Sequence, residues 1–144
     1  MPISLAEAIK NAIVAEQSAE QFYLRLVRLC AEAKGRQIFT EIAAQEHAHA
    51  AALEALAVEL VAGRLPDRPD ALVQVIESAP LGDNAGSLTL AEALEIALDA
   101  ENSAVLYYDA LATTASGEAA TFFARMGREE EGHAASILAM LNAI

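Results

Sequence analysis

Two short motifs in this sequence pair a glutamate with a histidine three residues later. The first motif is Glu46 and His49, within the alanine-rich stretch AAQEHAHAAAL, and the second is Glu130 and His133, within GREEEGHAASIL. Residues three apart on an α-helix share a face, so each motif presents a carboxylate and an imidazole side by side. Both groups are ligands for divalent metal ions, and their repetition therefore predicts one metal site built from two halves.

An internal repeat surrounds these motifs. Segments 4–26 and 89–111 align at an offset of 85 residues with 11 of 23 positions identical, and segments 39–53 and 123–137 align at an offset of 84. The first alignment pairs Glu16 with Glu101 and Tyr23 with Tyr108. A repeat on this scale indicates two copies of one supersecondary unit.

The composition predicts that these units are helical. The chain has 34 alanines but only 7 glycines and 4 prolines, and alanine has the highest intrinsic helix propensity. Capping-box patterns, Ser4 with Glu7 and Thr89 with Glu92, mark two helix starts. The dipeptides at 34–35 and 116–117 are expected to separate helices within each unit. The expected helices span about 4–32, 36–62, 88–115 and 118–142.

The expected fold is an all-α, antiparallel four-helix bundle. Two repeated hairpins, 4–62 and 88–142, are joined by a long crossover at 63–87 that is rich in proline, glycine and aspartate. The stretch PDALVQVIESA (69–79) predicts a short helix within this crossover. We expect residues 1–144 to form a single domain of this kind, because short loops make antiparallel neighbours and a long connection permits a crossover.

The helical period assigns four glutamates to apolar faces. Four buried carboxylates do not stay ionised without strong compensation, and the arginines and lysines lie away from these faces. Two divalent cations balance four negative charges, and neutral imidazoles complete the coordination. Oxygen and imidazole donors without a thiolate suit iron or manganese, with zinc as a substitute. The predicted ligands are Glu16, Glu46, His49, Glu101, Glu130 and His133.

Four further residues are candidates for roles beside this site. Tyr23 and Tyr108 lie two helical turns after Glu16 and Glu101. They are expected to be core aromatics or hydrogen-bond donors to ligating carboxylates. His47 falls on another helix face, where it is solvated or hydrogen-bonds to a ligand. Glu20 is an additional carboxylate ligand, a group for proton or metal passage, or a bundle-edge residue that reaches water.

Charge and composition exclude several classes of protein. The net charge of −12 argues against nucleic acid as a partner. No 18-residue stretch is free of charge, which argues against a membrane span, and the N-terminus shows no secretory signal. The single cysteine, Cys30, excludes an internal disulfide, is expected in the core, and suits a reducing cytoplasm.

The glutamate and histidine pattern resembles the ferritin-like diiron-carboxylate superfamily. The pattern consists of Glu16, EHAH (46–49), Glu101 and EEGH (130–133), and it spans almost the whole chain. AEQSAEQFYLRL followed by QEHAHAAAL is most similar to the rubrerythrin branch. The resemblance implies a four-helix bundle with a dinuclear iron centre that reacts with H2O2 or O2. By position, the terminal ligands are Glu16 with His49 and Glu101 with His133, and the bridging ligands are Glu46 and Glu130.

Two departures from rubrerythrins bear on the activity. Rubrerythrins commonly carry a rubredoxin-type iron site made of Cys-x-x-Cys pairs, whereas this chain has one cysteine, so an external donor such as a rubredoxin-like protein is expected to supply electrons. Rubrerythrins also often have a carboxylate, linked to peroxidase-type iron movement, where this chain has Ala104. Three functions stay open: a peroxidase or oxidase, a ferroxidase that stores iron, and a non-catalytic helical interaction module. The chain ends soon after the fourth helix, without the extra helix of cage ferritins, which favours the first.

We predict that the protein is a homodimer, with or without exchanged hairpins. Small side chains on the second helix, at Ala50, Ala51, Ala55 and Val58, are expected to lie partly outside one bundle's core. Light scattering at micromolar concentration should report twice the chain mass. A monomer would contradict this prediction, and a mass of about 24 subunits would favour a ferritin.

Overall fold

A computed structural model describes residues 4–61, 63–67 and 88–144 of the chain. Four helices make up most of these residues, which confirms the all-α class. They are α1 (Leu5–Leu29), α2 (Ala33–Leu60), α3 (Leu90–Thr114) and α4 (Gly117–Ala143). The short helix expected at 69–79, and all of the expected crossover after residue 67, lie outside the described residues.

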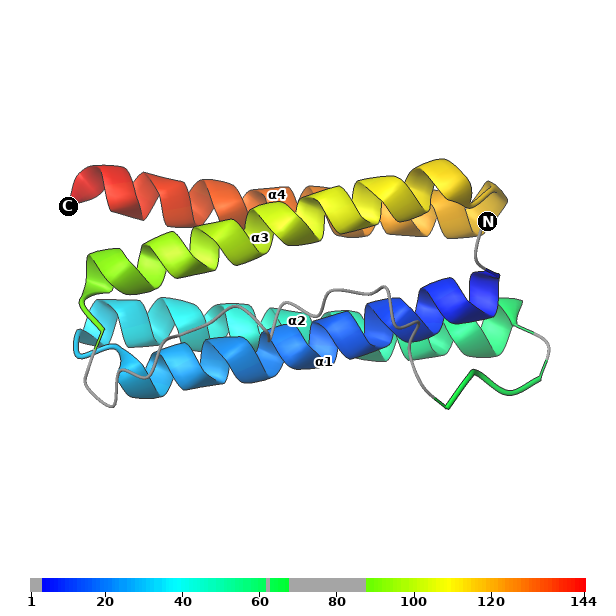
Figure 1. The fold of residues 1–144 in the computed structure, drawn as a ribbon, viewed down its shortest axis with the longest axis horizontal. Helices are drawn as coiled ribbons and strands as arrows, with labels where there is room; N and C mark the ends of the chain where they lie inside the picture. Colours follow the sequence, from blue (N-terminus) through cyan, green and yellow to red (C-terminus); the bar gives the residue numbers. More distant parts are fainter. Residues whose placement is uncertain (1–3, 62, 68–87) are drawn as a thin grey trace.

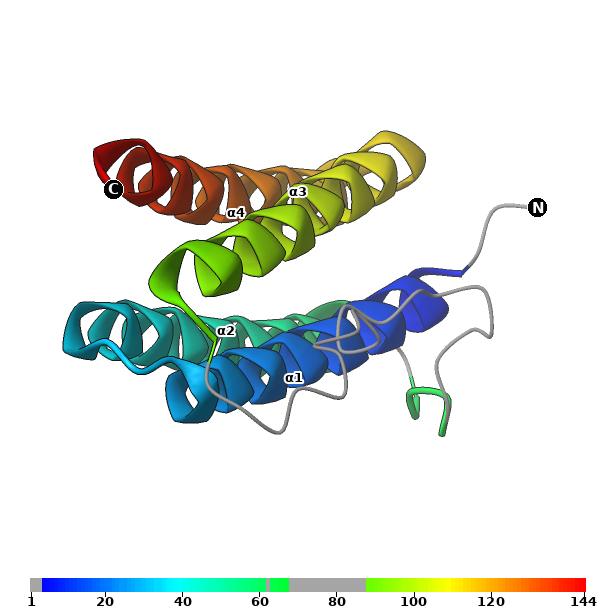
Figure 2. The same ribbon diagram turned by 60° about the vertical axis from the view of Figure 1, so that its left-hand side comes forward.

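The helices form two antiparallel hairpins. In both views of the ribbon, α1 runs beside α2 and α3 runs beside α4 (Figures 1 and 2). α2 ends and α3 begins at opposite ends of the bundle, as a crossover connection requires (Figure 1). The backbone N–H of Leu88 donates to the carbonyl of Leu29 at 2.8 Å, so the start of the second hairpin is tied to the end of α1.

Side-chain caps begin the first helix of each hairpin where the sequence predicts them. The Ser4 hydroxyl accepts the N–H of Glu7 at 3.1 Å. Thr89 makes the complete capping box, because it accepts the N–H of Glu92 at 3.2 Å and donates its own N–H to the Glu92 carboxylate at 3.1 Å. These bonds satisfy N–H groups that otherwise lack a partner at a helix start.

Gly35 does not separate the first two helices as expected. It lies inside α2, and the chain turns earlier, where the Arg36 guanidinium donates to the carbonyls of Cys30 and Ala31 at 3.2 and 2.6 Å. A β-carbon at Gly35 would lie 2.7 Å from both Cys30 Sγ and Leu90 Cδ1. This glycine therefore serves close packing at the base of the bundle, and sequence alone did not separate that role from a helix break.

With the turn at its observed place, the two hairpins have the same internal spacing. In each hairpin, the first helix ends 13 residues after its central glutamate. The glutamate of the second helix lies 13 residues after that helix begins. At about 1.5 Å per residue, all four carboxylates lie at the same level, roughly 20 Å from the loops. The glutamates are Glu16 and Glu101, measured from Leu29 and Thr114, and Glu46 and Glu130, measured from Ala33 and Gly117.

Two apolar clusters occupy the bundle on either side of this level. One is built around Phe22, Tyr23, Phe39 and Leu94, and the other around Ile9, Leu53, Tyr108, Phe123 and Met126. Most of these side chains are fully buried. The ionisable residues therefore lie at the middle of a bundle whose two ends are held by hydrophobic packing.

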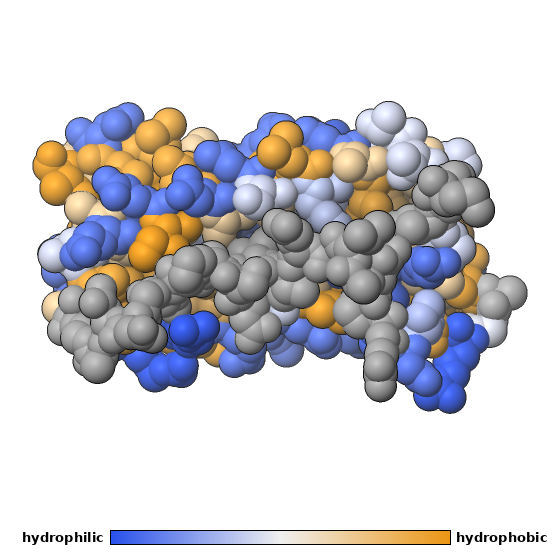
Figure 3. Space-filling model, in the orientation of Figure 1, coloured by the Kyte–Doolittle hydropathy of each residue, from blue (hydrophilic) through white to orange (hydrophobic). Residues whose placement is uncertain are grey.

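Several apolar side chains remain exposed. Val58, Leu106 and Ile144 are the most exposed large ones among the described residues. Ala51 and Ala55 are also exposed, whereas Ala50 is buried. On the face drawn in Figure 3, apolar side chains gather at the end of the bundle that holds the C-terminus. None of the described helices has an uncharged apolar stretch long enough to cross a membrane.

Candidate metal centre

Six ionisable side chains from all four helices converge at the middle of the bundle. α1 and α3 each contribute one glutamate, and α2 and α4 each contribute a glutamate and a histidine one turn later. They are Glu16, Glu46, His49, Glu101, Glu130 and His133. The four glutamates are at most 2% exposed, so their carboxylates lie out of reach of bulk water.

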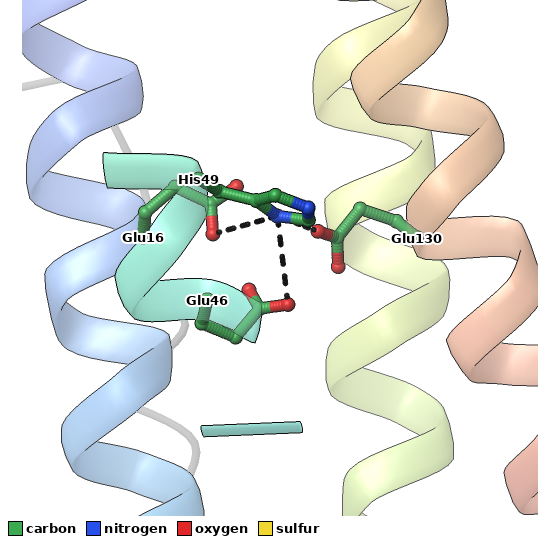
Figure 4. A group of neighbouring side chains, drawn as sticks. All are labelled: Glu16, Glu46, His49 and Glu130. Atoms are coloured by element: carbon green, nitrogen blue, oxygen red, sulfur yellow. Dashed lines mark ion pairs between the residues drawn. The ribbon is translucent and has the colours of Figure 1, made fainter. Parts of the chain in front are cut away.

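One half of the centre surrounds the inward ring nitrogen of His49. His49 Nδ1 lies 3.0 Å from Glu130 Oε1, 3.5 Å from Glu16 Oε2 and 3.8 Å from Glu46 Oε1. Figure 4 shows these side chains pointing at one another across the space between the two hairpins. One ligand atom of each lies within 4.8 Å of the others, which is close enough to hold a metal ion.

The other half repeats this geometry around His133. His133 Nδ1 lies 3.1 Å from Glu46 Oε1, 3.5 Å from Glu101 Oε1 and 3.6 Å from Glu130 Oε2. These residues form a second group with the same 4.8 Å limit. Glu46 and Glu130 belong to both groups, so the arrangement has two terminal carboxylates and two shared ones.

The unpaired atoms of these residues fit two metal ions. Among the described residues, eight buried side-chain nitrogen and oxygen atoms have no hydrogen-bond partner, and seven of them belong to the six converging residues. They include both inward Nδ1 atoms and both carboxylate oxygens of Glu130. Buried polar atoms without partners are costly, and these seven belong to residues whose ligand atoms meet in the two groups. Oxygen and imidazole donors with no thiolate suit iron or manganese, and also zinc.

Two tyrosines hold the terminal carboxylates from the opposite hairpin. The hydroxyl of Tyr23 on α1 donates to Glu101 on α3 at 2.5 Å, and that of Tyr108 on α3 donates to Glu16 on α1 at 2.5 Å. Both tyrosines are almost fully buried, and each packs against the equivalent phenylalanine of its own hairpin, Tyr23 tilted on Phe39 and Tyr108 stacked on Phe123. Tyr23 and Tyr108 are thus both buried members of the apolar clusters and hydrogen-bond donors to the carboxylates.

The outward ring nitrogens have partners that sequence reasoning missed. His49 Nε2 lies 2.7 Å from Glu129 Oε2, and His133 Nε2 contacts Gln45 Oε1. Gln45 and Glu129 are equivalent in the repeat, and each directly precedes a shared glutamate. Their register was visible in the sequence, but each reaches a histidine on the opposite hairpin, which no local pattern predicts.

Glu20 lies outside both groups. Its carboxylate is 3.1 Å from His47 Nδ1, and the His47 side chain is 72% exposed. The structure therefore places both residues at the bundle edge, paired with each other across α1 and α2. Neither contacts a predicted ligand in the described interactions.

Burial and crowding shift the pKa values of the converging groups. Burial raises the pKa of Glu101 to about 8 and that of Glu46 well above its ordinary value, although His133 opposes both shifts. Burial alone lowers the pKa of His49 and His133, but the surrounding carboxylates outweigh it and raise the values to about 10 and about 12. Glu130 shows the reverse balance, because the two imidazoles outweigh burial and lower its pKa.

Among the described residues, a pocket opens toward the two histidines, while the space beside Tyr23 is tightly filled. A pocket of about 450 Å³ lies over the histidines between α2 and α4, lined by Gln45, Ala48, His49, Glu129 and His133. On the side of α1 and α3, the space beside Tyr23 and Ala104 has no room for a water molecule. The pocket reaches the two histidine rings, whereas the four carboxylates stay buried. A small reactant would therefore approach from the α2 and α4 side.

Comparison with known proteins identifies relatives of both sequence and fold. The family model named Rubrerythrin matches residues 92–144, which cover nearly all of the second hairpin. No curated protein matches the chain. The internal repeat carries the same ligand pattern into the first hairpin, which lies outside the matched residues.

Three solved structures share the fold over almost the whole chain. An uncharacterised conserved protein from Magnetospirillum magnetotacticum has a TM-score of 0.81 at 22% identity, over 98% of this chain and 95% of its own. The bacterioferritin-related protein of Bacteroides fragilis, described as a dodecameric thioferritin, has a TM-score of 0.75 at 18% identity, over 96% of this chain and 84% of its own. A hypothetical protein from Pyrococcus furiosus has a TM-score of 0.73 at 21% identity, over 97% of this chain and 89% of its own. These likenesses confirm the ferritin-like four-helix bundle.

The raised pKa values predict how the stability of the metal-free protein depends on pH. A group whose pKa is higher in the folded state stabilises fully below its unfolded pKa, and this stability is lost as pH rises through the folded value. As pH rises, the loss of stability begins near pH 4.5 for Glu46 and Glu101 and near pH 6.5 for the histidines. It extends to about pH 8 for Glu101 and about pH 10 for His49. Glu130 adds an opposite loss below pH 4.5.

In urea unfolding of chelator-treated protein, the urea concentration at the midpoint should therefore be highest at about pH 5 and fall up to about pH 9. The same scan with zinc present should weaken or reverse this fall, because metal binding displaces the protons. A midpoint of the metal-free protein that rises from pH 5 to pH 9 would contradict the assigned shifts.

The tyrosine hydrogen bonds predict a matched set of stability changes. Tyr23→Phe and Tyr108→Phe each leave a buried carboxylate oxygen unpaired, which should cost about 1–3 kcal/mol of unfolding free energy. Tyr107→Phe is the control, because the buried hydroxyl of Tyr107 has no hydrogen-bond partner among the described residues and its removal should be neutral or stabilising. Chemical denaturation of the three variants measures these changes, and equal effects at all three positions would show that the two bonds contribute nothing.

Proposed function

We propose that this chain is a rubrerythrin-like protein that binds two iron ions and oxidises them with H2O2 or O2. The match of residues 92–144 to the rubrerythrin family model and the ferritin-like fold support this proposal. The observation that carries the proposal is the pair of overlapping ligand groups sharing Glu46 and Glu130, with seven unpaired buried donor atoms between them. Glu16 and His49 would complete one position, and Glu101 and His133 the other.

Charge balance supports two divalent ions. Four buried glutamates carry four negative charges when ionised, and no lysine or arginine pairs with them in the described contacts. Leaving such charges uncompensated costs several kcal/mol for each ion. Two divalent cations neutralise the set, and manganese or zinc are expected to occupy the same positions.

The residues around the ligands supply position and access. Tyr23 and Tyr108 fix the terminal carboxylates, so that Glu101 and Glu16 keep their orientation while the shared glutamates adjust. When bound, two ferrous ions would supply the two electrons that reduce hydrogen peroxide to water. The pocket over His49 and His133 admits a small oxidant, and the closed opposite side keeps water away from Glu101.

We further propose that electrons return from an external donor such as a rubredoxin-like protein. The sequence contains one cysteine, Cys30, which is buried and lies apart from the centre. A homodimer that covers exposed α2 side chains such as Val58, and a cytoplasmic location, complete the proposal.

Ferroxidation is the competing function. The Bacteroides fragilis neighbour is described as a thioferritin, and Ala104 stands where many rubrerythrins have an additional carboxylate. Both functions use the same ligands and differ in the fate of the oxidised iron. Continued uptake of added Fe(II) distinguishes storage from redox turnover.

The test combines metal loading with rapid kinetics. Anaerobic protein should bind about two Fe(II) per chain and gain thermal stability by mass action. Mixing the loaded protein with each oxidant in a stopped-flow instrument should show peroxide reacting faster than dioxygen for a peroxidase. Faster reaction with dioxygen, together with continued iron uptake, would instead support the ferroxidase.

Variants set the limits of this test. The pair Glu46→Ala and Glu130→Ala should abolish two-ion binding, whereas Glu20→Gln, which changes a carboxylate outside both groups, should keep the stoichiometry. Wild-type protein that binds no iron and gains no stability would leave the non-catalytic interaction module as the better assignment.

A further inference from the structure

The ligands of the two proposed metal positions are equivalent in almost every respect. Each position has one terminal glutamate, and that glutamate accepts a hydrogen bond from a tyrosine of the opposite hairpin. Each also has one histidine that presents Nδ1 inward, and both positions share Glu46 and Glu130. Any difference between the positions must come from groups that contact these ligands from outside.

The outward contacts of the histidines provide such a difference. His49 Nε2 meets a carboxylate oxygen of Glu129 at 2.7 Å, while His133 Nε2 meets the side-chain carbonyl oxygen of Gln45. Glu129 and Gln45 occupy the same place in the repeat, on α4 and α2. The two contacts therefore join equivalent positions of the repeat but differ by one negative charge.

This charge acts on the imidazole through the hydrogen bond. With Nδ1 turned to the metal position, the single proton of the neutral ring lies on Nε2 and is donated outward. A carboxylate attracts that proton more strongly than an amide carbonyl does, which makes the ring a more basic ligand. The Glu129 side chain is 46% exposed, so its longer-range field is screened by water and the direct contact with His49 carries the effect.

We infer that Glu129 and Gln45 make the two metal positions unequal, so that the Glu16 and His49 position binds a divalent ion first and more tightly than the Glu101 and His133 position. Glu129 and Gln45 act as positioning residues, since they contact the histidines and not the metal positions. The inference rests on the proposed two-ion centre, and it adds an order of filling that the symmetric ligand set does not provide.

Zinc titration of the metal-free protein tests the inequality without any turnover. Isothermal calorimetry should resolve two binding steps whose affinities differ by about 10- to 100-fold, the range expected for a partner of a ligating histidine. With one equivalent of Zn(II), the ring ¹⁵N resonances of His49 should shift before those of His133. Two steps of equal affinity, or His133 shifting first, would overturn the inference.

Reciprocal variants identify the cause. Glu129→Gln removes the charge while keeping an oxygen acceptor, and Gln45→Glu adds a charge at the matching place, so each should bring the two affinities together. The double exchange of both residues should restore the difference with His133 shifting first. A difference that persists in Glu129→Gln would show that Glu129 is not its source.

A neighbouring carboxylate provides the matched control. Glu131 is exposed on α4 and has no described contact with either histidine, so Glu131→Gln removes the same charge without touching the hydrogen bond. It should leave the two affinities as far apart as in the wild type, and a merging of the steps in this variant would overturn the inference. Absence of any zinc binding by the wild type would instead overturn the two-ion centre itself, and the filling order with it.

Discussion

The burial of four glutamates within a few ångströms of one another is the constraint on which the rest of this structure depends. Each carboxylate loses hydration and each repels the others, which is why the pKa values of Glu46 and Glu101 rise. The fold answers this cost with two imidazoles, two tyrosine hydroxyls and a geometry suited to two cations. Apolar clusters on both sides hold the helices around a centre that would otherwise separate them.

The duplicated hairpin turns one solution into two halves that depend on each other. Tyr23 bonds to the carboxylate of the second hairpin and Tyr108 to that of the first. The histidines likewise find their outward partners across the gap between hairpins. Because these bonds cross between the hairpins, neither hairpin pairs all of its own buried polar groups. The hydrogen bonds of the centre therefore help to hold the two hairpins together.

The departures from this symmetry are where the two halves acquire separate properties. Gln45 opposite Glu129 gives the histidines unlike partners, and Glu20, which faces His47, has Val105 as its counterpart. Among the described residues, a pocket lies over α2 and α4, whereas the space between Tyr23 and alanines such as Ala104 has no room for a water molecule. A duplicated scaffold therefore supplies the ligands, and a few unmatched side chains determine access and inequality.

Local periodicity along the chain was enough to predict the helices and the residues that share their faces. The 3.6-residue repeat of an α-helix places Glu46 and His49 on one apolar face, and the duplication assigns the same arrangement to Glu130 and His133. Four helices, their approximate ends and the convergence of six side chains could be predicted on this basis. Gly35 was misread, because a glycine demanded by packing against Cys30 and Leu90 looks the same in sequence as one that ends a helix.

Which hairpin each polar group reaches was not visible in the sequence and depends on how the helices pack against one another. Tyr23 pairs with Glu101 and not with Glu16 on its own helix, and Gln45 contacts His133 although His49 lies one turn away on the same helix. The same packing brings the Glu20 carboxylate to His47 at the bundle edge. Such choices depend on the rotation and depth of one helix against another, which are set by the packing of the whole core, and no local pattern along the chain carries that information.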